Sequence, residues 1–362
     1  MSQKQLSGRF LIKHRKGMKK VFIGIDFSKQ KFDATVIKAE GITENSVRVH
    51  SSFMNDVKGY REFLRWVKEN ASKTDISEWL FCGEDTGIYS VPLSKHLYGK
   101  GYDIWIEDAY RIKHSIGIQR AKSDKADSAN IAEYAMRQQD KAKLYVPLSP
   151  SLEGLREIFL FRHKLVQEKC GLQTRANEKR EVLQKSHALS FMSRKARHLI
   201  AEIDKAIEEC DNEMHKLIME DEELKENFEI ITSIKGVALQ NATGLIVYTN
   251  NFHKFDHDAR KIACYYGVAP FGKTSGTSLK SQPHVSKLAN RMLKALLSEA
   301  ARCAIRFCDE IQCYYRRMID RGKKPGVAIN NVRNKMLHII VAMVRNKKKY
   351  DPCYRLRPIN AL

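Results

Sequence analysis

The sequence is poor in the features that mark zinc-binding or disulfide-bonded proteins. Its eight cysteines are scattered over 362 residues, and none forms a Cys-x-x-Cys pair. Zinc fingers need such close pairs, and small secreted scaffolds need a regular cysteine framework. We therefore expect reduced thiols in a cytoplasm, where cysteines are kept unpaired.

Long apolar runs are also missing. The longest near the N-terminus is Phe10–Ile12, and the longest near the other end is Leu337–Val344, which His338 interrupts. A signal peptide needs an apolar core of about 7–15 residues and a membrane-spanning helix needs about 20. We expect no membrane partner. Residues 1–20 contain seven lysines or arginines and no acid, which predicts a basic arm.

Acidic residues are in the minority. The chain has 42 aspartates and glutamates against 64 lysines and arginines, a formal net charge of +22. A basic protein binds polyanions because each neutralised phosphate releases condensed counterions. A merely basic protein, or one that lies on an anionic membrane, would carry the same excess, but neither needs clustered carboxylates. Acid clusters in this chain therefore favour nucleic acid as the partner.

The N-terminal third of the chain has the pattern of a mixed α/β sheet domain. With 43% hydrophobic residues, a chain of this length is expected to form two or three domains. Short apolar, β-branched runs alternate there with one amphipathic stretch. The expected strands are Val21–Asp26, Phe32–Lys38, Ser46–Phe53, Glu78–Cys82 and Asp103–Ile106, with a helix at Val57–Val67. A basic, loop-like stretch, Arg111–Lys122, then precedes a helix at Ser123–Gln138.

The middle of the chain contains no proline between Pro150 and Pro270, which permits long helices. Apolar residues from Ile200 to Leu217 recur in alternating steps of three and four, which is a heptad pattern. With the helix-compatible stretch Leu152–Gln184, this pattern predicts a helical, coiled-coil spacer over residues 150–229. The two stretches form either an antiparallel hairpin within one chain or part of a dimer interface.

The region from residue 230 to 350 is expected to be mainly helical. Ile231–Val237 resembles the glycine turn of a helix-hairpin-helix module, which presents backbone N–H groups to a phosphate, and plain helix-turn-helix packing accounts for it nearly as well. Arg321–Tyr350 contains nine lysines or arginines and no acid, so it either follows a phosphate backbone or is a solvated face. Residues 351–362 form a tail.

Four acids are candidates for a metal site. Asp26 and Glu84 each follow an apolar run, at the carboxyl end of an expected strand. Asp124 and Asp127 lie three residues apart at the start of an expected helix and share one face. Converging carboxylates suit Mg²⁺ or Mn²⁺, and a pair of such ions serves phosphodiester transfer. In strand, strand, helix order, the set favours a ribonuclease-H-like fold.

Each acid also has a simpler explanation. Aspartate caps helices and stabilises their N-termini, and Asp124 is well placed for that role. Asp33 and Asp85 compete with the chosen acids, because strand alternation alone does not decide between Glu84 and Asp85.

Three segments contain the four candidate acids in the strand, strand, helix order of a ribonuclease-H-like domain: Gly24–Lys29, Glu84–Tyr89 and Ala121–Asp127. Together they resemble the DEDD transposase family of insertion sequences, which includes the Piv-type DNA invertases. The resemblance continues through Tyr266–Pro270, Ser275–Ser278 and Lys287–Arg291 and covers about residues 21–344. It implies a RuvC-like domain at residues 21–149, with Mg²⁺ or Mn²⁺ bound by the four acids, and a transposase domain at 230–350.

In that family the serine of a Ser-Gly pair is the proposed nucleophile, a role that the resemblance transfers to Ser275. A serine hydroxyl is a weak nucleophile at neutral pH and needs a base or a metal to attack phosphorus. The chain departs from the family at Ala289–Asn290 and Lys294, where Gly-Asn and an arginine are usual. The implied partners are donor and target DNA, a structured non-coding bridge RNA, and further copies of the chain in a dimer or tetramer with composite active sites. The implied location is the cytoplasm of a bacterium or archaeon, at the nucleoid.

Two other functions stay open on the sequence alone. A RuvC-like nuclease or junction resolvase would use the same four carboxylates with a metal-activated water and leave Ser275 structural. A non-catalytic nucleic-acid-binding protein would use only the positive charge, with the acids as helix caps.

Overall fold

The computed structural model describes residues 19–39, 48–71, 74–115, 124–182, 186–272, 274–275, 279–280, 284–286 and 289–352. The expected basic arm therefore lies outside the described residues, except for Lys19 and Lys20. The chain divides into two compact units, residues 1–147 and 148–362. Each unit has its own hydrophobic core among the described residues.

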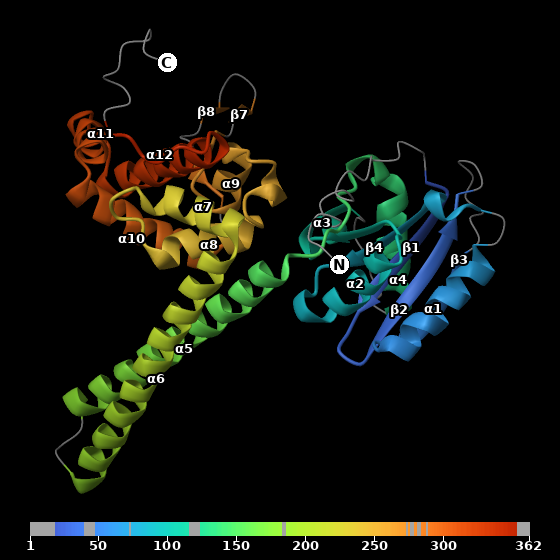
Figure 1. The fold of residues 1–362 in the computed structure, drawn as a ribbon, viewed down its shortest axis with the longest axis horizontal. Coiled ribbons are helices and arrows are strands. Elements are labelled where there is room, and N and C mark those ends of the chain that lie inside the picture. The colour runs from blue at the N-terminus through green and yellow to red at the C-terminus, as the bar shows by residue number, and fades with distance from the viewer. Residues whose placement is uncertain are drawn as a thin grey trace. The chain divides into compact units, whose positions relative to one another are not determined.

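The first unit contains a five-stranded mixed sheet, as the sequence predicts (Figure 1). The strands are β1 (Val21–Phe27), β2 (Lys31–Lys38), β3 (Arg48–Met54), β4 (Trp79–Glu84) and β5 (Ile104–Glu107). Their order is β3-β2-β1-β4-β5, with β1, β2 and β3 antiparallel and β4 parallel to both β1 and β5. The carboxyl ends of β1, β4 and β5 therefore lie at one edge of the sheet.

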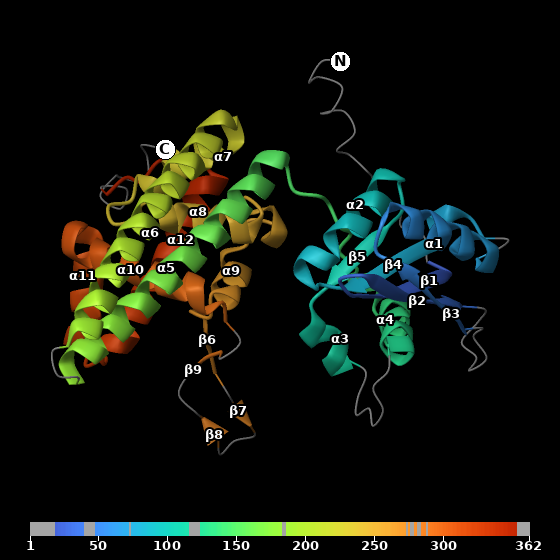
Figure 2. The ribbon, with the colours of Figure 1, turned by 90° about the horizontal axis from the view of Figure 1, so that it is seen from below.

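The sheet is covered by helices on both faces (Figure 2). Strands β1 and β4 bury apolar side chains on both of these faces. Helix α1 (Val57–Asn70) buries Phe63 and Val67 on one face, where α2 (Val91–Gly99) also packs. Helix α4 (Asp124–Arg137) lies on the other face, against Phe22 and Trp105. The expected helices at residues 57–67 and 123–138 are confirmed, although Ser123 lies outside the described residues.

Two short helices were not expected from the sequence. The stretch that begins at Arg111 was expected to be a loop, but α3 (Ala109–Ser115) is helical as far as Ser115. Ile112 is buried on the inner side of α3, so tertiary packing stabilises this helix. A single apolar residue in the sequence is too little to predict a helix there. Helix α2 was missed for the reason that only Leu93 and Leu97 mark its buried face. Residues 116–122 of the expected loop lie outside the described residues.

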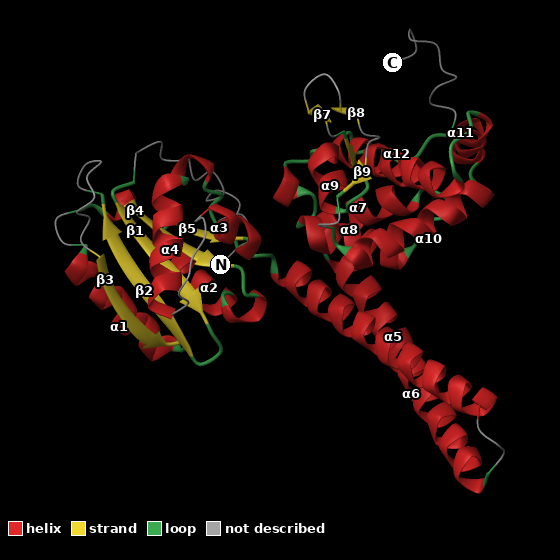
Figure 3. Ribbon diagram, turned by 180° about the vertical axis from the view of Figure 1, so that it is seen from behind, coloured by secondary structure: helices red, strands yellow, loops and turns green. Residues whose placement is uncertain are grey.

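The second unit is mainly helical, as expected, and includes two long helices packed side by side (Figures 1 and 3). Helices α5 (Pro150–Val182) and α6 (His187–Glu220) run antiparallel. The heptad positions Cys210 and Met214 are buried, and Arg162 of α5 donates two hydrogen bonds to Asp211 of α6 at 2.6 and 3.0 Å. The seam is thus used within one chain, and a spacer role for the pair stays a prediction.

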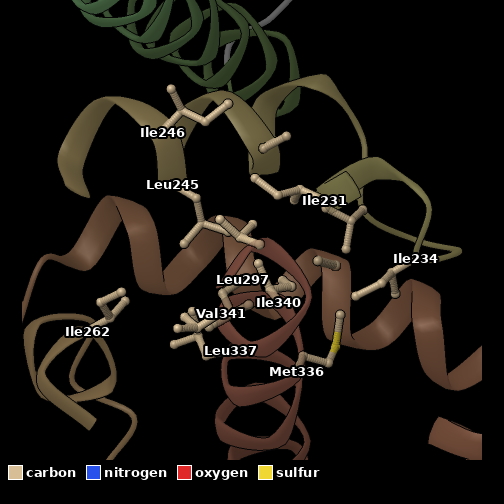
Figure 4. Close-up of a cluster of buried hydrophobic side chains, with 14 of the residues drawn as sticks. Ile231, Ile234, Leu245, Ile246, Ile262, Leu297, Met336, Leu337, Ile340 and Val341 are labelled. Atoms are coloured by element: carbon tan, nitrogen blue, oxygen red, sulfur yellow. The ribbon is translucent and has the colours of Figure 1, made fainter. Parts of the chain in front are cut away.

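The remaining helices form one core, and apolar residues of α12 lie at its centre (Figure 4). These helices are α7 (Glu222–Thr232), α8 (Leu239–Thr249), α9 (Ala259–Tyr265), α10 (Arg291–Phe307), α11 (Asp309–Asp320) and α12 (Pro325–Arg345). On α12, Met336, Leu337 and Ile340 are fully buried. Their burial explains the apolar stretch that the sequence shows there.

The turn between α7 and α8 is a packing element. Gly236 has a φ of +100°, and a Cβ at this position would lie 2.6 Å from the backbone nitrogen of Ala304 in α10. Ile234 and Val237 on either side are buried in the same core. Close helix packing therefore accounts for this glycine, which favours the simpler of the two interpretations of the motif.

Within the described residues, no helix is long and apolar enough to cross a membrane.

Candidate functional site

The two strand acids lie side by side at the carboxyl edge of the sheet. Asp26 is the sixth residue of β1 and Glu84 is the last of β4. The parallel register pairs Ile25 with Gly83, so one residue further along it sets Asp26 beside Glu84. Side chains two residues apart in a strand share a face, and Phe22 of β1 and Cys82 of β4 face α4, so Asp26 and Glu84 belong to the α4 face of the sheet. Both are partly exposed.

Two more acids extend this pair into a row. Asp33 of β2 is directly opposite Asp26, and Glu107 of β5 is level with Glu84. The carboxylate row is thus Asp33, Asp26, Glu84 and Glu107, on four adjacent strands and one face. Glu107 was not recognised from the sequence, although it ends the apolar run Ile104–Ile106 much as Glu84 ends its own strand.

The outer members of the row are held by neighbouring groups. Asp33 is 5% exposed and accepts a hydrogen bond from the Ser52 hydroxyl, with Lys31 Nζ at 3.3 Å and His50 Nε2 at 3.4 Å. These contacts offset the cost of burying a carboxylate. Asp33 is therefore a supporting member of the row and a weaker candidate for a metal ligand than Asp26.

Glu107 is 9% exposed and is held from three sides. It accepts hydrogen bonds from the backbone N–H of Asp108 at 2.9 Å and from the Tyr134 hydroxyl at 3.2 Å, and Arg111 Nη1 is 3.7 Å away. Burial, followed by the Glu107 charge, raises the pKa of Tyr134 to about 12, so Tyr134 stays a hydrogen-bond donor at neutral pH. The same causes raise the pKa of the Cys82 thiol.

Helix α4 supplies the other two predicted acids. A Cβ at Gly24 would lie 2.1 Å from the backbone oxygen of Ser128, so β1 and α4 approach each other as closely as a glycine allows. Asp127 precedes Ser128 and is partly exposed, and Asp124 is the first residue of the helix. The Asp124 side chain lies outside the described part, so its position in the site stays a prediction.

A buried polar cluster fixes the first turns of α4 on the sheet. The Ser128 hydroxyl lies 2.8 Å from Thr35 Oγ1 and 3.3 Å from Nδ1 of His50, whose other ring nitrogen faces Asp33. Ser128 is fully buried. This cluster therefore sets the position of Asp127 relative to the carboxylate row.

The donor chemistry of the row fits a hard divalent cation, because carboxylate oxygens are the ligands that Mg²⁺ and Mn²⁺ prefer. Among the side chains that the structure describes, no three histidines, cysteines or acids stand close enough to form a metal site by themselves. Asp26 and Glu84 are the pair best placed to hold an ion, and a third ligand would come from α4.

The predicted serine lies in the second unit, in a segment with two short antiparallel strand pairs that is called the serine hairpin below (Figure 2). Ser275 belongs to β7 (Thr274–Ser275), which pairs with β8 (Leu279–Lys280). The base of this segment is formed by β6 (Pro270–Phe271) and β9 (His284–Val285). The side chain of Ser275 lies outside the described part, so its role stays a prediction.

The residues that flank the serine hairpin are bonded to α9, which precedes it, and to α10, which follows it. Asn290 caps α10 by accepting a hydrogen bond from the N–H of Leu293 at 3.1 Å, and its own N–H donates to the Tyr265 oxygen of α9 at 3.3 Å. Gly267 has a φ of +63°, and a Cβ there would lie 2.2 Å from the Cβ of Ala289. Asn290 is therefore structural, and Ala289 is accommodated by a glycine opposite.

The mixed sheet with acids at its strand ends is consistent with a ribonuclease-H-like DEDD domain. Residues 23–188 match the IS110-type DEDD domain described as "Transposase", and residues 228–316 match the "Transposase IS116/IS110/IS902 family". The chain belongs to the DEDD transposase family of insertion sequences. This membership places it among the transposases and recombinases of DNA.

Individual relatives agree with this membership. The chain is 25% identical over 338 residues to the pilin gene-inverting proteins of Moraxella bovis and Moraxella lacunata, which covers 92% of this chain and 98% of each relative. It is 30% identical over 122 residues to an uncharacterized 43.6 kDa protein of insertion element IS110 from Streptomyces coelicolor, which covers 34% of this chain and 30% of that protein.

Proposed function

We propose that this transposase cuts and rejoins DNA through a covalent link to Ser275, with Mg²⁺ or Mn²⁺ bound by Asp26, Glu84, Asp124 and Asp127. The observation that carries the proposal is the register that sets Asp26 beside Glu84 at the carboxyl edge of the sheet. Two like charges side by side on neighbouring strands repel each other, and a divalent cation bound between them would offset that repulsion.

Bound at this edge, a divalent ion would supply positive charge to a phosphodiester that reacts there. Asp26 and Glu84 would hold the ion, and the Thr35–Ser128–His50 cluster would keep Asp127 in place above it. Asp33 and Glu107 would add negative charge from the two sides without direct ligation.

The covalent step conserves the number of phosphodiester bonds. The oxygen of Ser275 attacks phosphorus and loses its proton to solvent. The bond between phosphorus and the oxygen of the neighbouring nucleotide breaks, and that oxygen takes up a proton. Reversal of this step with a new DNA end restores the serine and joins the strands without ATP. A pilin gene-inverting relative is in keeping with such a reaction, because inversion of a DNA segment needs rejoined ends.

The acids and the serine belong to separate compact units of the chain. We propose a dimer or tetramer in which the serine of one protomer serves the carboxylates of another. We further propose that a structured non-coding bridge RNA directs the reaction to donor and target DNA in the cytoplasm of a bacterial or archaeal cell. The net charge of +22 supports the binding of two nucleic acids.

The test is a cleavage reaction resolved on a denaturing gel. Purified protein, Mg²⁺, RNA transcribed from the DNA that flanks its reading frame, and a donor DNA end are incubated together. We expect a protein-DNA adduct that is lost in Asp26→Ala, Glu84→Ala and Ser275→Ala and in the presence of EDTA. Loss of one catalytic group lowers such rates by at least about 100-fold.

Two matched variants serve as controls. Asp85 is exposed, follows Glu84 and accepts a hydrogen bond from the N–H of Gly87 at 3.1 Å, so Asp85→Ala should keep activity. Ser278→Ala removes a neighbouring hydroxyl and should also keep activity. Equal losses in Glu84→Ala and Asp85→Ala would contradict the assignment of Glu84.

Other outcomes identify the alternatives. Nicked DNA that survives Ser275→Ala but not Asp26→Ala identifies a hydrolytic nuclease or junction resolvase. Salt-sensitive binding with no product in any variant identifies a non-catalytic nucleic-acid-binding protein.

A further inference from the structure

Helices α10 and α12 pack together and carry three cationic side chains that have no acidic partner among the residues that the structure describes. Lys294 lies in the first turn of α10, Arg302 lies about two turns further on, and Arg333 lies on α12. None of the three forms an ion pair within the described residues, whereas Lys335, on the same helix as Arg333, pairs with Glu310 at 2.8 Å. These three residues are called the cation cluster below.

The cation cluster is costly for the free protein. Nε of Arg333 is fully buried and has no hydrogen-bond partner among the described residues, and its Nη1 makes only a long contact of 3.5 Å with Asn330 Oδ1. Burial, followed by the charge of Arg302, lowers the pKa of Arg333. Burial, followed by the charge of Arg333, lowers the pKa of Lys294. A buried donor without a partner costs about 1–3 kcal/mol, and more if it is charged.

The cation cluster adjoins the base of the serine hairpin. Asn330, which contacts Arg333, donates a hydrogen bond at 2.9 Å to the backbone oxygen of Val268, two residues before β6 begins. Lys294 follows the cap residue Asn290 by one turn, and its backbone N–H donates to the Asn290 oxygen at 3.0 Å. The segment before β6 is therefore bonded to α12, and α10, which carries Lys294, begins at Arg291, shortly after β9 ends at Val285.

We propose that Lys294 and Arg333, with Arg302 at the exposed side, bind a backbone phosphate of DNA next to the bond that Ser275 attacks. An anion between these side chains would supply the acceptor that Arg333 lacks, and a guanidinium can donate two parallel hydrogen bonds to one phosphate. This inference rests on the proposed function, because the position beside the serine hairpin is what favours DNA over RNA as the source of the phosphate.

The test measures equilibrium binding without metal and without cutting. A labelled DNA duplex of about 30 base pairs is titrated with wild type, Arg333→Gln, Lys294→Gln and Arg316→Gln over about 50–200 mM salt. Arg316 is exposed on α11, so its variant removes the same charge outside the cluster. For each cluster variant, we expect the slope of log K against log salt to shrink by about 0.9, the value for one lost phosphate contact. Arg316→Gln should leave the slope unchanged.

Thermal unfolding without DNA separates binding from folding. Arg333→Gln removes a half-buried charge whose Nε has no hydrogen-bond partner among the described residues, so we expect its Tm to be equal to or higher than that of wild type. Arg333→Lys keeps the charge and should keep the salt slope, with weaker binding from the lost second hydrogen bond. A lower Tm with an unchanged slope for both Arg333→Gln and Lys294→Gln would show a structural role and overturn the inference.

A further comparison completes the test. The titration contains no metal and measures no cleavage, so failure of the cleavage assay does not decide its result. An RNA duplex of equal length is titrated in parallel. If the cluster variants weaken only RNA binding, or if Arg316→Gln matches them, the assignment to DNA is wrong.

Discussion

Gly24 shows how one residue can set the geometry of a site. It lies two residues before Asp26 on β1, and a Cβ there would come within 2.1 Å of the Ser128 oxygen and 2.3 Å of the Ala132 nitrogen in α4. Both neighbours are backbone atoms, which cannot move without moving the helix. The glycine thus sets the distance between the acids of β1 and those of α4.

We therefore expect Gly24→Ala to destabilise the first unit by about 1–3 kcal/mol or more, because overpacking forces the helix off the sheet. The matched control is Gly99→Ala at the end of α2, where a Cβ meets nothing within 4 Å. That change should be neutral or stabilise by up to about 1 kcal/mol. Denaturant unfolding monitors both, and equal effects of the two changes would refute the close contact.

At the scale of elements, the connection after α8 is unusual. Asn250, Asn251 and Phe252 have φ angles of +50°, +50° and +72°, and Asp256 and His257 are also left-handed. A positive φ strains the backbone of a non-glycine residue, and such residues adopt it only where other contacts offset the strain. Here Phe252 is fully buried, and the Asn251 amide accepts from Asn227 and donates to Glu223.

Glu223 also bonds His253 Nε2 at 2.9 Å, and this pair predicts a pH dependence. The bond raises the pKa of His253 above its ordinary 6.5, so its contribution is full below pH 6.5 and is lost as pH rises through the folded-state pKa. The same bond lowers the pKa of Glu223 below 4.5, so its contribution is present above pH 4.5 and is lost as pH falls.

The pair should therefore stabilise this connection most between about pH 4.5 and 6.5. Both side chains are largely exposed, so the effect should not exceed about 1 kcal/mol. We expect wild type and His253→Gln to differ most in unfolding free energy at about pH 5.5 and to converge at about pH 9. A difference that does not vary with pH would show that the ion pair contributes nothing.

At the scale of the whole molecule, the hydrophobic cores are separate. The cores around Phe81 and Phe22 lie in the first unit and the core around Leu337 lies in the second, and none of these clusters of described residues spans both. Domains with independent cores unfold independently unless an extensive interface joins them.

Calorimetry should accordingly resolve two unfolding transitions. Phe81 and Leu337 are both fully buried, and truncation to alanine should cost roughly 3–5 and 2–5 kcal/mol respectively. We expect Phe81→Ala to lower one transition and Leu337→Ala the other. If both variants shift the same single transition, the two units unfold as one.

Much of the molecule follows from local sequence. The five strands, α1 and α4 were predicted because apolar periodicity is a local property of the chain, and the family was recognised because its motifs are contiguous segments. The same alternation does not decide between Glu84 and Asp85, because only the tertiary structure shows that Leu80 and Cys82 face α4, and the catalytic role of Glu84 stays a prediction.

Other features depend on which segments meet in space. Glu107 joins the row only because β5 pairs with β4, and Lys294 meets Arg333 only because α10 packs on α12. Helices α2 and α3 were missed because too few residues mark their buried faces. The sequence by itself determined the strands, the strongly periodic helices, the charge and the acid motifs, since these arise within short stretches. Only the tertiary structure decided the strand register and the partners of each buried charge, because both depend on residues far apart in the chain.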